Sequence, residues 1–150
     1  MLIVFDLDFT LWDCGGTWCD HTNPPYRRHN GIILDADQRT IRLYPGVKDI
    51  LKRLQERDIT LGVASRTSAP DWADELMHLF GIKDFFRHFE IYPGSKINHF
   101  KSLKDATGFD YDQMLFFDDE YRNIDEVSRL GVKAVFVEDG IRPDLVDRHL

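Results

Sequence analysis

Four aspartates directly follow two short apolar runs of this chain. The runs are residues 2–5 and 114–117, and the aspartates that follow them are Asp6, Asp8, Asp118 and Asp119. A short apolar run without polar alternation is typical of a strand buried on both faces of a parallel sheet. Ligands of such sheets bind outside the carboxyl ends of the strands, so the four acids meet there if the strands are neighbours. Carboxylates this close require protonation or a cation, and oxygen ligands suit magnesium.

The elements that must hold these aspartates alternate along the chain. Apolar segments predict strands at residues 2–5, 59–64, 89–92, 114–117 and 132–137. Helical spacing and turn residues predict helices at about 45–58, 70–80, 95–106 and 120–130. Strands that alternate with helices indicate an α/β fold with a parallel sheet covered on both faces. With 150 residues, of which 43% are hydrophobic, we expect one domain over residues 1–150.

The insert at about residues 13–44 is too long for an ordinary connection between a strand and a helix. Residues 32–34 and 40–44 flank a polar turn and predict a β-hairpin. Long inserts at the functional end of a sheet usually contact the ligand, so we expect a flap over the site. Cys14 and Cys19 lie in this insert, and we expect reduced thiols in a surface loop. A soft-metal site with His21 is the less favoured alternative, because zinc normally takes four ligands.

Charge and hydropathy argue against two classes of partner. The net charge of −7 disfavours a groove that holds nucleic acid through its phosphates. No apolar run approaches the length of a membrane span, and no signal peptide opens the chain. We therefore expect a cytoplasmic protein that binds neither nucleic acid nor membrane.

Four motifs, in this order, resemble those of the haloacid dehalogenase (HAD) superfamily of hydrolases. They are Asp6-x-Asp8-x-Thr10, Ser65, Lys96 and Asp118-Asp119. Longer strings resemble the small magnesium-dependent phosphatase-1 family within it: FDLDFTLW from residue 5, ASRTS from residue 64, IYPGSK from residue 91 and FFDDE from residue 116. The resemblance runs from residue 2 to about residue 140, and residues 13–31 depart most from the family's pattern.

The resemblance implies a HAD-type, Rossmann-like three-layer fold with a small hairpin flap in place of a full cap domain. It places the first strand between the strands that end at Ser65 and Asp119. It implies hydrolysis of phosphate monoesters, in which Asp6 attacks phosphorus and forms an aspartyl-phosphate. A carboxylate nucleophile is already charged, so it needs orientation and charge cancellation more than a base. Asp8 would protonate the leaving alkoxide and then deprotonate the attacking water.

The resemblance also implies a magnesium site. Mg²⁺ would be held by one oxygen of Asp6, the backbone carbonyl of Asp8 and the side chain of Asp119. Asp118 would lie behind these ligands and orient Lys96, or it would cap the following helix.

Further residues are expected around the substrate and the metal. The expected substrate contacts are Leu7, Ser65, Arg66, Lys96 and Trp18. Ser65 offers a hydroxyl to phosphate, Lys96 offsets charge in the transition state, and Arg66 acts through its backbone N–H or its guanidinium. Trp18, or Trp12, packs either on the leaving group or on the rest of the domain. Asn123, one helical turn after Asp119, supports that ligand or is a plain surface residue.

The predicted function is that of a magnesium-dependent phosphatase. A small flap leaves room for bulky substrates, and the resemblance supports two of them: a phosphotyrosine on a protein, and a phosphorylated sugar such as a fructosamine phosphate. A phosphotransferase or phosphomutase with the same intermediate is one alternative, although transfer requires the exclusion of water. A metal-binding interaction module without turnover is a second, weaker alternative.

Overall fold

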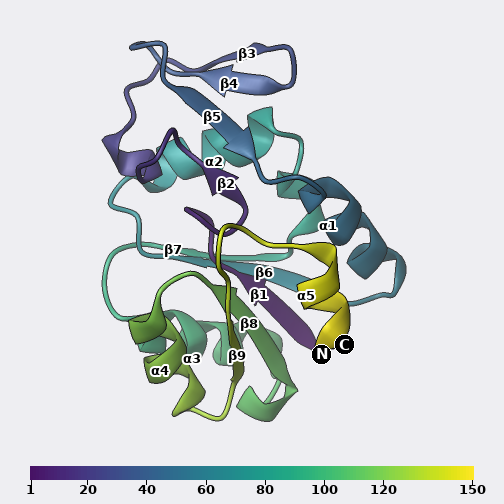
Figure 1. Ribbon diagram of the computed structural model, residues 1–150. Coiled ribbons are helices and arrows are strands. Elements are labelled where there is room, and N and C mark those ends of the chain that lie inside the picture. Colours follow the sequence, from purple (N-terminus) through teal and green to yellow (C-terminus); the bar gives the residue numbers. More distant parts are fainter.

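Five parallel strands form the centre of the protein, in a computed structural model that describes residues 1–150. They are β1 Leu2–Phe5, β6 Thr60–Ser65, β7 His88–Ile91, β8 Met114–Asp118 and β9 Lys133–Phe136. Their order is β7-β6-β1-β8-β9, so β1 lies between β6 and β8 as expected (Figure 1). All four residues of β1 are buried, which agrees with the absence of polar alternation in its sequence.

Helices cover both faces of this sheet. They are α1 Val47–Glu56, α2 Pro70–Leu79, α3 Lys96–Thr107, α4 Tyr121–Ser128 and α5 Pro143–Arg148. Ile3 and Phe5 of β1 pack in a core with α1, α2 and α5, whereas Leu2 and Val4 pack in a second core with α3 and α4. Because side chains alternate along a strand, these cores lie on opposite faces of the sheet. The predicted three-layer α/β fold is confirmed.

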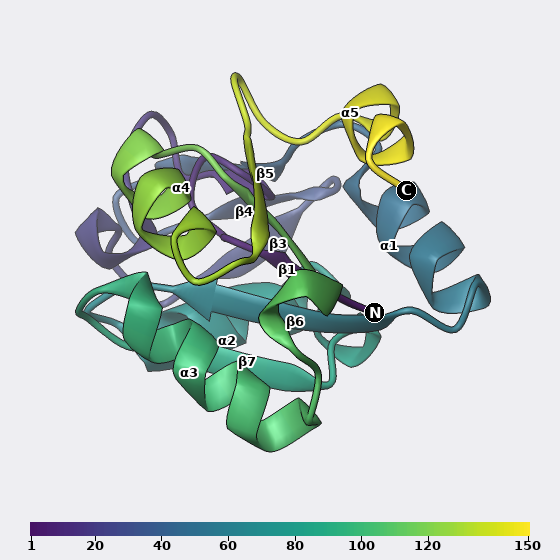
Figure 2. The ribbon, with the colours of Figure 1, turned by 90° about the horizontal axis from the view of Figure 1, so that it is seen from below.

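The predicted strands and helices lie close to the observed ones. The hydroxyl of Ser95 accepts a hydrogen bond from the backbone N–H of Ile97 at 3.2 Å and so caps the start of α3. Gly108, with a φ of 74°, ends the same helix. Helix α5 was not predicted, because its six residues are too few for a helical pattern; it lies beside α1 in both views (Figures 1 and 2). None of the helices has the length and apolar character that crossing a membrane requires.

A second, antiparallel sheet forms the flap. Its strands are β2 Trp12–Asp13, β3 Arg27–His29, β4 Ile32–Leu34 and β5 Thr40–Leu43, in the order β2-β5-β4-β3. The predicted hairpin is the pair of β4 and β5, whose Ile33 and Ile41 are buried in the larger core. The sequence gives little sign of the other two strands: β2 has two residues, and β3 is an exposed Arg-Arg-His segment. The flap stands over the end at which β1 stops (Figure 1).

Candidate active site

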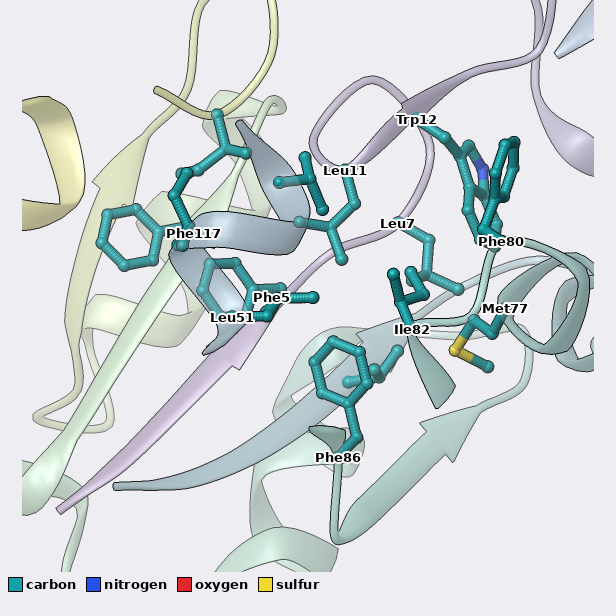
Figure 3. Packing of buried hydrophobic residues seen from close by; sticks show 14 of the residues in the cluster. Phe5, Leu7, Leu11, Trp12, Leu51, Met77, Phe80, Ile82, Phe86 and Phe117 are labelled. Carbon is teal, nitrogen blue, oxygen red and sulfur yellow. The ribbon is translucent and has the colours of Figure 1, made fainter. Parts of the chain in front are cut away.

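The loop that carries the first two aspartates is anchored in the core. Leu7, Leu11 and Trp12 have no exposed surface, and they point into the packed interior (Figure 3). The carbonyl oxygen of Leu7 accepts hydrogen bonds from the backbone N–H groups of Thr10 (3.1 Å), Leu11 (2.8 Å) and Trp12 (3.3 Å). Phe9 takes a left-handed φ of 62°, so this is a tight, specific turn. The side chain of Leu7, an expected substrate contact, belongs to the core, which leaves only its backbone for a substrate.

Asp6 and Lys96 meet at the carboxyl edge of the sheet. Phe5 of β1 is in register with Phe117 of β8, so the residues after each strand emerge side by side. The ammonium of Lys96, 1% exposed, lies 2.8 Å from Oδ1 of Asp6 and also contacts Oδ2 of Asp118. Burial would lower the pKa of Lys96, but the charges of Asp6 and Asp118 hold it above its ordinary value. The lysine is therefore a fixed positive charge inside the site.

One lysine does not balance the aspartates around it. Burial raises the pKa of Asp6 to about 8, against the opposing charge of Lys96. Burial, and then the charge of Asp6, raise the pKa of Asp118 to about 6, and burial raises the pKa of Asp119. Carboxylate oxygens of Asp6, Asp118 and Asp119 all lie within 4.8 Å of one another. Such a set of oxygens with excess negative charge fits a hard divalent cation.

The two aspartates after β8 differ in their hydrogen bonds. Asp118 is wholly buried, and both its oxygens are used: Oδ1 accepts from the N–H of Glu120 at 2.8 Å, and Oδ2 accepts from Lys96 and, at 3.1 Å, from Asn123. Asp119 is half-buried, and Oδ1 accepts one long hydrogen bond, 3.5 Å, from the hydroxyl of Thr10. Asp119 is thus free to bind a metal, whereas Asp118 is fully engaged and holds Lys96. Asn123 was expected to support Asp119, but its amide donates to Asp118.

Asp8 is held by the start of the flap. Its Oδ1 accepts hydrogen bonds from the indole N–H of Trp12 at 2.7 Å and the backbone N–H of Cys19 at 2.9 Å. The thiol of Cys14 lies 3.6 Å from the same oxygen. Burial raises the pKa of Asp8, although these hydrogen bonds oppose the shift. A raised pKa favours the protonated carboxyl, which suits a group that gives and takes a proton.

Two residues of this network did not stand out among the candidates from the sequence. Trp12 was expected to contact the leaving group or the domain. Its ring is buried against Phe80, so it packs on the domain, and its N–H also fixes Asp8. Thr10 has no exposed surface, and its hydroxyl donates to Oδ2 of Asp6 at 3.2 Å as well as to Asp119. The signal was their spacing, since each lies four residues after the aspartate that it contacts.

The cysteines of the flap are not surface thiols. Cys14 and Cys19 have no exposed surface and form no disulfide, so the expected surface loop is wrong. Burial raises the pKa of both thiols, which makes them unreactive. The thiol of Cys19 lies 3.3 Å from the hydroxyl of Thr67, on the loop after β6. Both residues pack the flap against the sheet instead of facing solvent.

A cavity of about 230 Å³ opens over these groups. Its lining residues are Asp6, Asp8, Trp18, Asp20, His21, Ser65, Arg66, Thr67, Lys96, Asp119, Glu120, Arg122 and Asn123. Ser65, 2% exposed, ends β6, and its hydroxyl accepts a hydrogen bond from the backbone N–H of Thr67 at 3.3 Å. The guanidinium of Arg66 donates to Oδ1 of Asn123 at 3.0 Å, so it is fixed at the wall. Every expected site residue except Leu7 and Asp118 thus lines one cavity.

The flap closes one side of this cavity. Trp18 is 46% exposed and meets Phe9 and His21 edge to face, with ring centroids 5.9 and 5.4 Å apart. Asp20 accepts a hydrogen bond from the hydroxyl of Ser68 at 2.9 Å, which ties the flap to the loop after β6. An aromatic side chain with nearly half its surface free is placed to meet a ligand at the mouth.

Comparison with known proteins agrees with this geometry. The sequence profile of the acid phosphatase family matches residues 1–150. Human magnesium-dependent phosphatase 1 is 46% identical over 151 aligned residues, covering 99% of this chain and 84% of that protein. A HAD-like hydrolase superfamily protein of Schizosaccharomyces pombe is 39% identical, covering 87% and 81%. A crystal structure described as a predicted phosphoglycolate phosphatase from Haemophilus somnus shares the fold at a TM-score of 0.73, with 18% identity, over 93% and 85% of the two chains.

The fold and the acidic cavity define a HAD-type hydrolase. The chain belongs to the acid phosphatase family of that superfamily, alongside the human magnesium-dependent phosphatase. It is a phosphatase, and its cluster of carboxylate oxygens suits the magnesium ion as cofactor.

Proposed function

We propose that this phosphatase hydrolyses phosphate monoesters through a covalent aspartyl-phosphate on Asp6. The observation that carries the proposal is the fixed orientation of this carboxylate. Lys96 donates to one oxygen of Asp6 and Thr10 to the other, while the group lines the cavity floor. A carboxylate nucleophile needs orientation and nearby positive charge, and these contacts supply both.

Asp8 is the proton carrier in this proposal. It lies two residues from Asp6 and lines the same cavity. Its three hydrogen-bonding contacts all use Oδ1, and burial raises its pKa. Asp8 gives a proton to the leaving oxygen in the first step and takes one from water in the second.

The metal ligands proposed for Mg²⁺ are one oxygen of Asp6, the backbone carbonyl of Asp8 and the carboxylate of Asp119. When bound, the ion neutralises the acid cluster and the oxygens of the phosphoryl group. Asp118 keeps Lys96 in place behind these ligands through the contact of Lys96 with its Oδ2. Ser65 and Lys96 bind the phosphoryl oxygens, and Arg66 braces the wall through its hydrogen bond to Asn123.

The substrates proposed are phosphate monoesters with a bulky leaving group: a phosphotyrosine on a protein, or a phosphorylated sugar adduct such as a fructosamine phosphate. The cavity is small, so it admits the phosphoryl group while the rest of the substrate lies at its mouth. Trp18 offers an apolar face there, and Arg122 and Asp20 offer charges of both signs. We expect these substrates in the cytoplasm. A screen of phosphopeptides and sugar phosphates for released phosphate separates the two classes.

The deciding experiment separates the two halves of the reaction with Asp8→Asn. An activated aryl phosphate loses its phenolate without a proton, so Asp6 still becomes phosphorylated, whereas activation of water by Asp8 is lost. We expect a burst of phenolate followed by slow turnover, and a phosphorylated Asp6 in the mass spectrum of the quenched protein. Hydrolysis of alkyl phosphates falls further, because their leaving groups need the proton. Equal losses for both substrates, with no burst and no trapped phosphate, would remove Asp8 from the role of proton carrier.

Transfer to a second alcohol is the alternative use of the same intermediate. It requires a site that excludes water. The mouth of this cavity is bounded by a tryptophan that is 46% exposed, which favours hydrolysis. Turnover in the presence of glycerol tests this: a phosphatase releases inorganic phosphate, and a transferase forms glycerol phosphate.

A further inference from the structure

His99 is a wholly buried histidine of α3 that lies behind the cavity. Its Nδ1 is 3.1 Å from the carbonyl oxygen of Ser95. Its Nε2 is 2.9 Å from the carbonyl oxygen of Ser65 and 2.8 Å from that of Tyr92. The ring of Tyr92 stacks on the imidazole at a centroid distance of 4.2 Å. His99 does not line the cavity, so it contacts no substrate and acts, if at all, through these neighbours.

Every partner of the two ring nitrogens is a carbonyl oxygen. Such an oxygen only accepts hydrogen bonds. A neutral imidazole has a single N–H, so one of its nitrogens would direct a lone pair at an oxygen. In a buried position an unmade hydrogen bond of this kind is costly. Only the doubly protonated ring donates at both Nδ1 and Nε2 and satisfies all of these contacts.

The surroundings of His99 contain charges of both signs. Lys96 and the N-terminal end of α3 lie on its own helix and oppose a positive ring. Three carbonyl dipoles favour a positive ring, and two of them belong to the carboxyl ends of β6 and β7. Glu126 of α4 accepts a hydrogen bond at 2.9 Å from the hydroxyl of Ser95, the residue whose carbonyl oxygen faces Nδ1 of the ring. Glu90 of β7 lies beside Tyr92.

The three carbonyl groups belong to the segments that carry the phosphate-binding side chains. Ser65 is itself one of these side chains, and Ser95 caps α3 directly before Lys96. Tyr92 begins the connection between β7 and α3, and its N–H donates to the carbonyl of Ser65 at 3.1 Å. A single side chain thus joins the end of β6 to the start of α3.

We propose that His99 is a positioning residue that carries a proton on both ring nitrogens and fixes Ser65 and Lys96 against the phosphoryl group. The inference rests on the phosphate-binding roles given to Ser65 and Lys96 in the proposed function. A loss of these hydrogen bonds lets the end of β6 shift relative to the start of α3. Shifts of about 1 Å at catalytic groups cost on the order of a hundredfold in rate.

The protonation of the ring is tested by NMR on ¹⁵N-labelled protein, with His99→Phe to assign the signals. At pH 7 we expect both ring nitrogens of His99 in the N–H form, with two slowly exchanging ring protons. The measurement needs no substrate and no turnover, so it stands even where the aspartyl-phosphate proposal fails. A ring with one N–H and one unprotonated nitrogen overturns the inference.

The positioning role is tested by steady-state kinetics on an aryl phosphate with Mg²⁺. His99→Phe keeps an aromatic ring against Tyr92 and removes all three hydrogen bonds. Leu103→Ala is the matched control, because Leu103 is wholly buried on the same helix and its side chain has no polar atom. We expect His99→Phe to lower kcat by about 10- to 100-fold with little change in KM. Leu103→Ala lowers the melting temperature yet keeps kcat within about twofold.

His99→Gln is a second variant for the case in which His99→Phe does not fold, since its amide retains hydrogen-bond donors. Its kcat should lie between those of the wild type and His99→Phe. If the folded His99 variants keep the kcat of Leu103→Ala, the histidine is only a packing residue and the inference is wrong. Failure of the proposed function is read separately, from substantial turnover by Asp6→Asn.

Discussion

The two sides of the cavity are built in different ways. On the side of the sheet, Asp6, Lys96 and Asp118 are at most 8% exposed, and they bond to one another and to neighbouring groups. On the side of the flap, Trp18 is 46% exposed, and its ring contacts are the edges of Phe9 and His21. The first side is a closed network of charges, and the second is an open rim of mixed chemistry.

We expect the difference to separate reaction from recognition. Groups that react must be held within a fraction of an ångström, and a buried hydrogen-bonded network does that. Groups that meet the variable part of a substrate gain from freedom to adapt. Changes on the side of the sheet should therefore destroy turnover for every substrate, and changes on the flap should redistribute it among substrates.

The largest loss is expected from Asp6→Asn. The amide has nearly the same shape but cannot form the covalent bond or bring negative charge to a metal. We expect kcat to fall by about 10⁴-fold or more for every substrate, with an unchanged fold by circular dichroism. Asp125→Asn is the control, because Asp125 of α4 is exposed and pairs with Arg129, and it should leave kcat unchanged. Substantial activity in Asp6→Asn would place the nucleophile elsewhere.

Removal of the metal should abolish activity, because it also acts on the sheet side of the cavity. EDTA leaves the three clustered aspartates without a cation, and they then repel the phosphate. We expect activity to fall to background and to return with Mg²⁺, measured as phosphate release. Ca²⁺ should restore little, because its longer and looser coordination misplaces the attacking oxygen. Full activity in EDTA would contradict the metal-dependent mechanism.

The charge imbalance on the side of the sheet should also appear in the stability of the metal-free protein. Burial raises the pKa of Asp6 to about 8 and that of Asp118 to about 6, both above the usual value of 3.8. Their contribution to the free energy of unfolding is then present below pH 3.8 and is lost as the pH rises through about 6 and 8.

Mg²⁺ should reverse this loss, since it binds the ionised carboxylates. We expect it to raise Tm more at pH 8 than at pH 5.5. The difference should be about 3 °C for each kcal/mol in a chain of this size, measured by calorimetry. Asp6→Asn should shrink the difference, because it removes the group whose pKa is raised to about 8. An equal increase in Tm at both pH values would show that the carboxylates of the cluster do not have the raised pKa values.

The smallest and most selective effect is expected from Trp18→Ala on the flap. Loss of the exposed ring removes apolar contact with the leaving group, so KM for an aryl phosphate or phosphopeptide should rise about three- to tenfold. For a small alkyl phosphate, KM should change by less than about twofold, and kcat should stay the same for both. A uniform loss of kcat would mean that Trp18 belongs to the same network as the aspartates.

Most residues on the sheet side of the cavity could be predicted from the sequence alone. Apolar strands without alternation marked β1 and β8, and the aspartates after them were bound to meet if those strands were neighbours. Ser65 and Lys96 followed from motif order, and both line the cavity. This success has a simple cause: parallel strands bring their carboxyl ends to one edge, so local sequence order becomes spatial proximity.

The remainder depended on contacts between segments that are distant in the sequence. Cys14 and Cys19 looked like surface thiols, and docking of the flap buries them. Asn123 is one helical turn from Asp119, yet the start of α4 turns its amide toward Asp118. The partners of His99 lie 7 and 34 positions away in the sequence as well as one helical turn back.

The sequence by itself determined which groups are proposed to react, because the types and order of Asp6, Asp8, Lys96 and Asp119 are local properties of the chain. Only the tertiary structure decided how these groups are held and charged. Burial raises the pKa of Asp6, and hydrogen bonds from Trp12 and the backbone of Cys19 fix Asp8. Burial and long-range hydrogen bonds exist only when the flap, the helices and the sheet close on one another, so no local pattern encodes them.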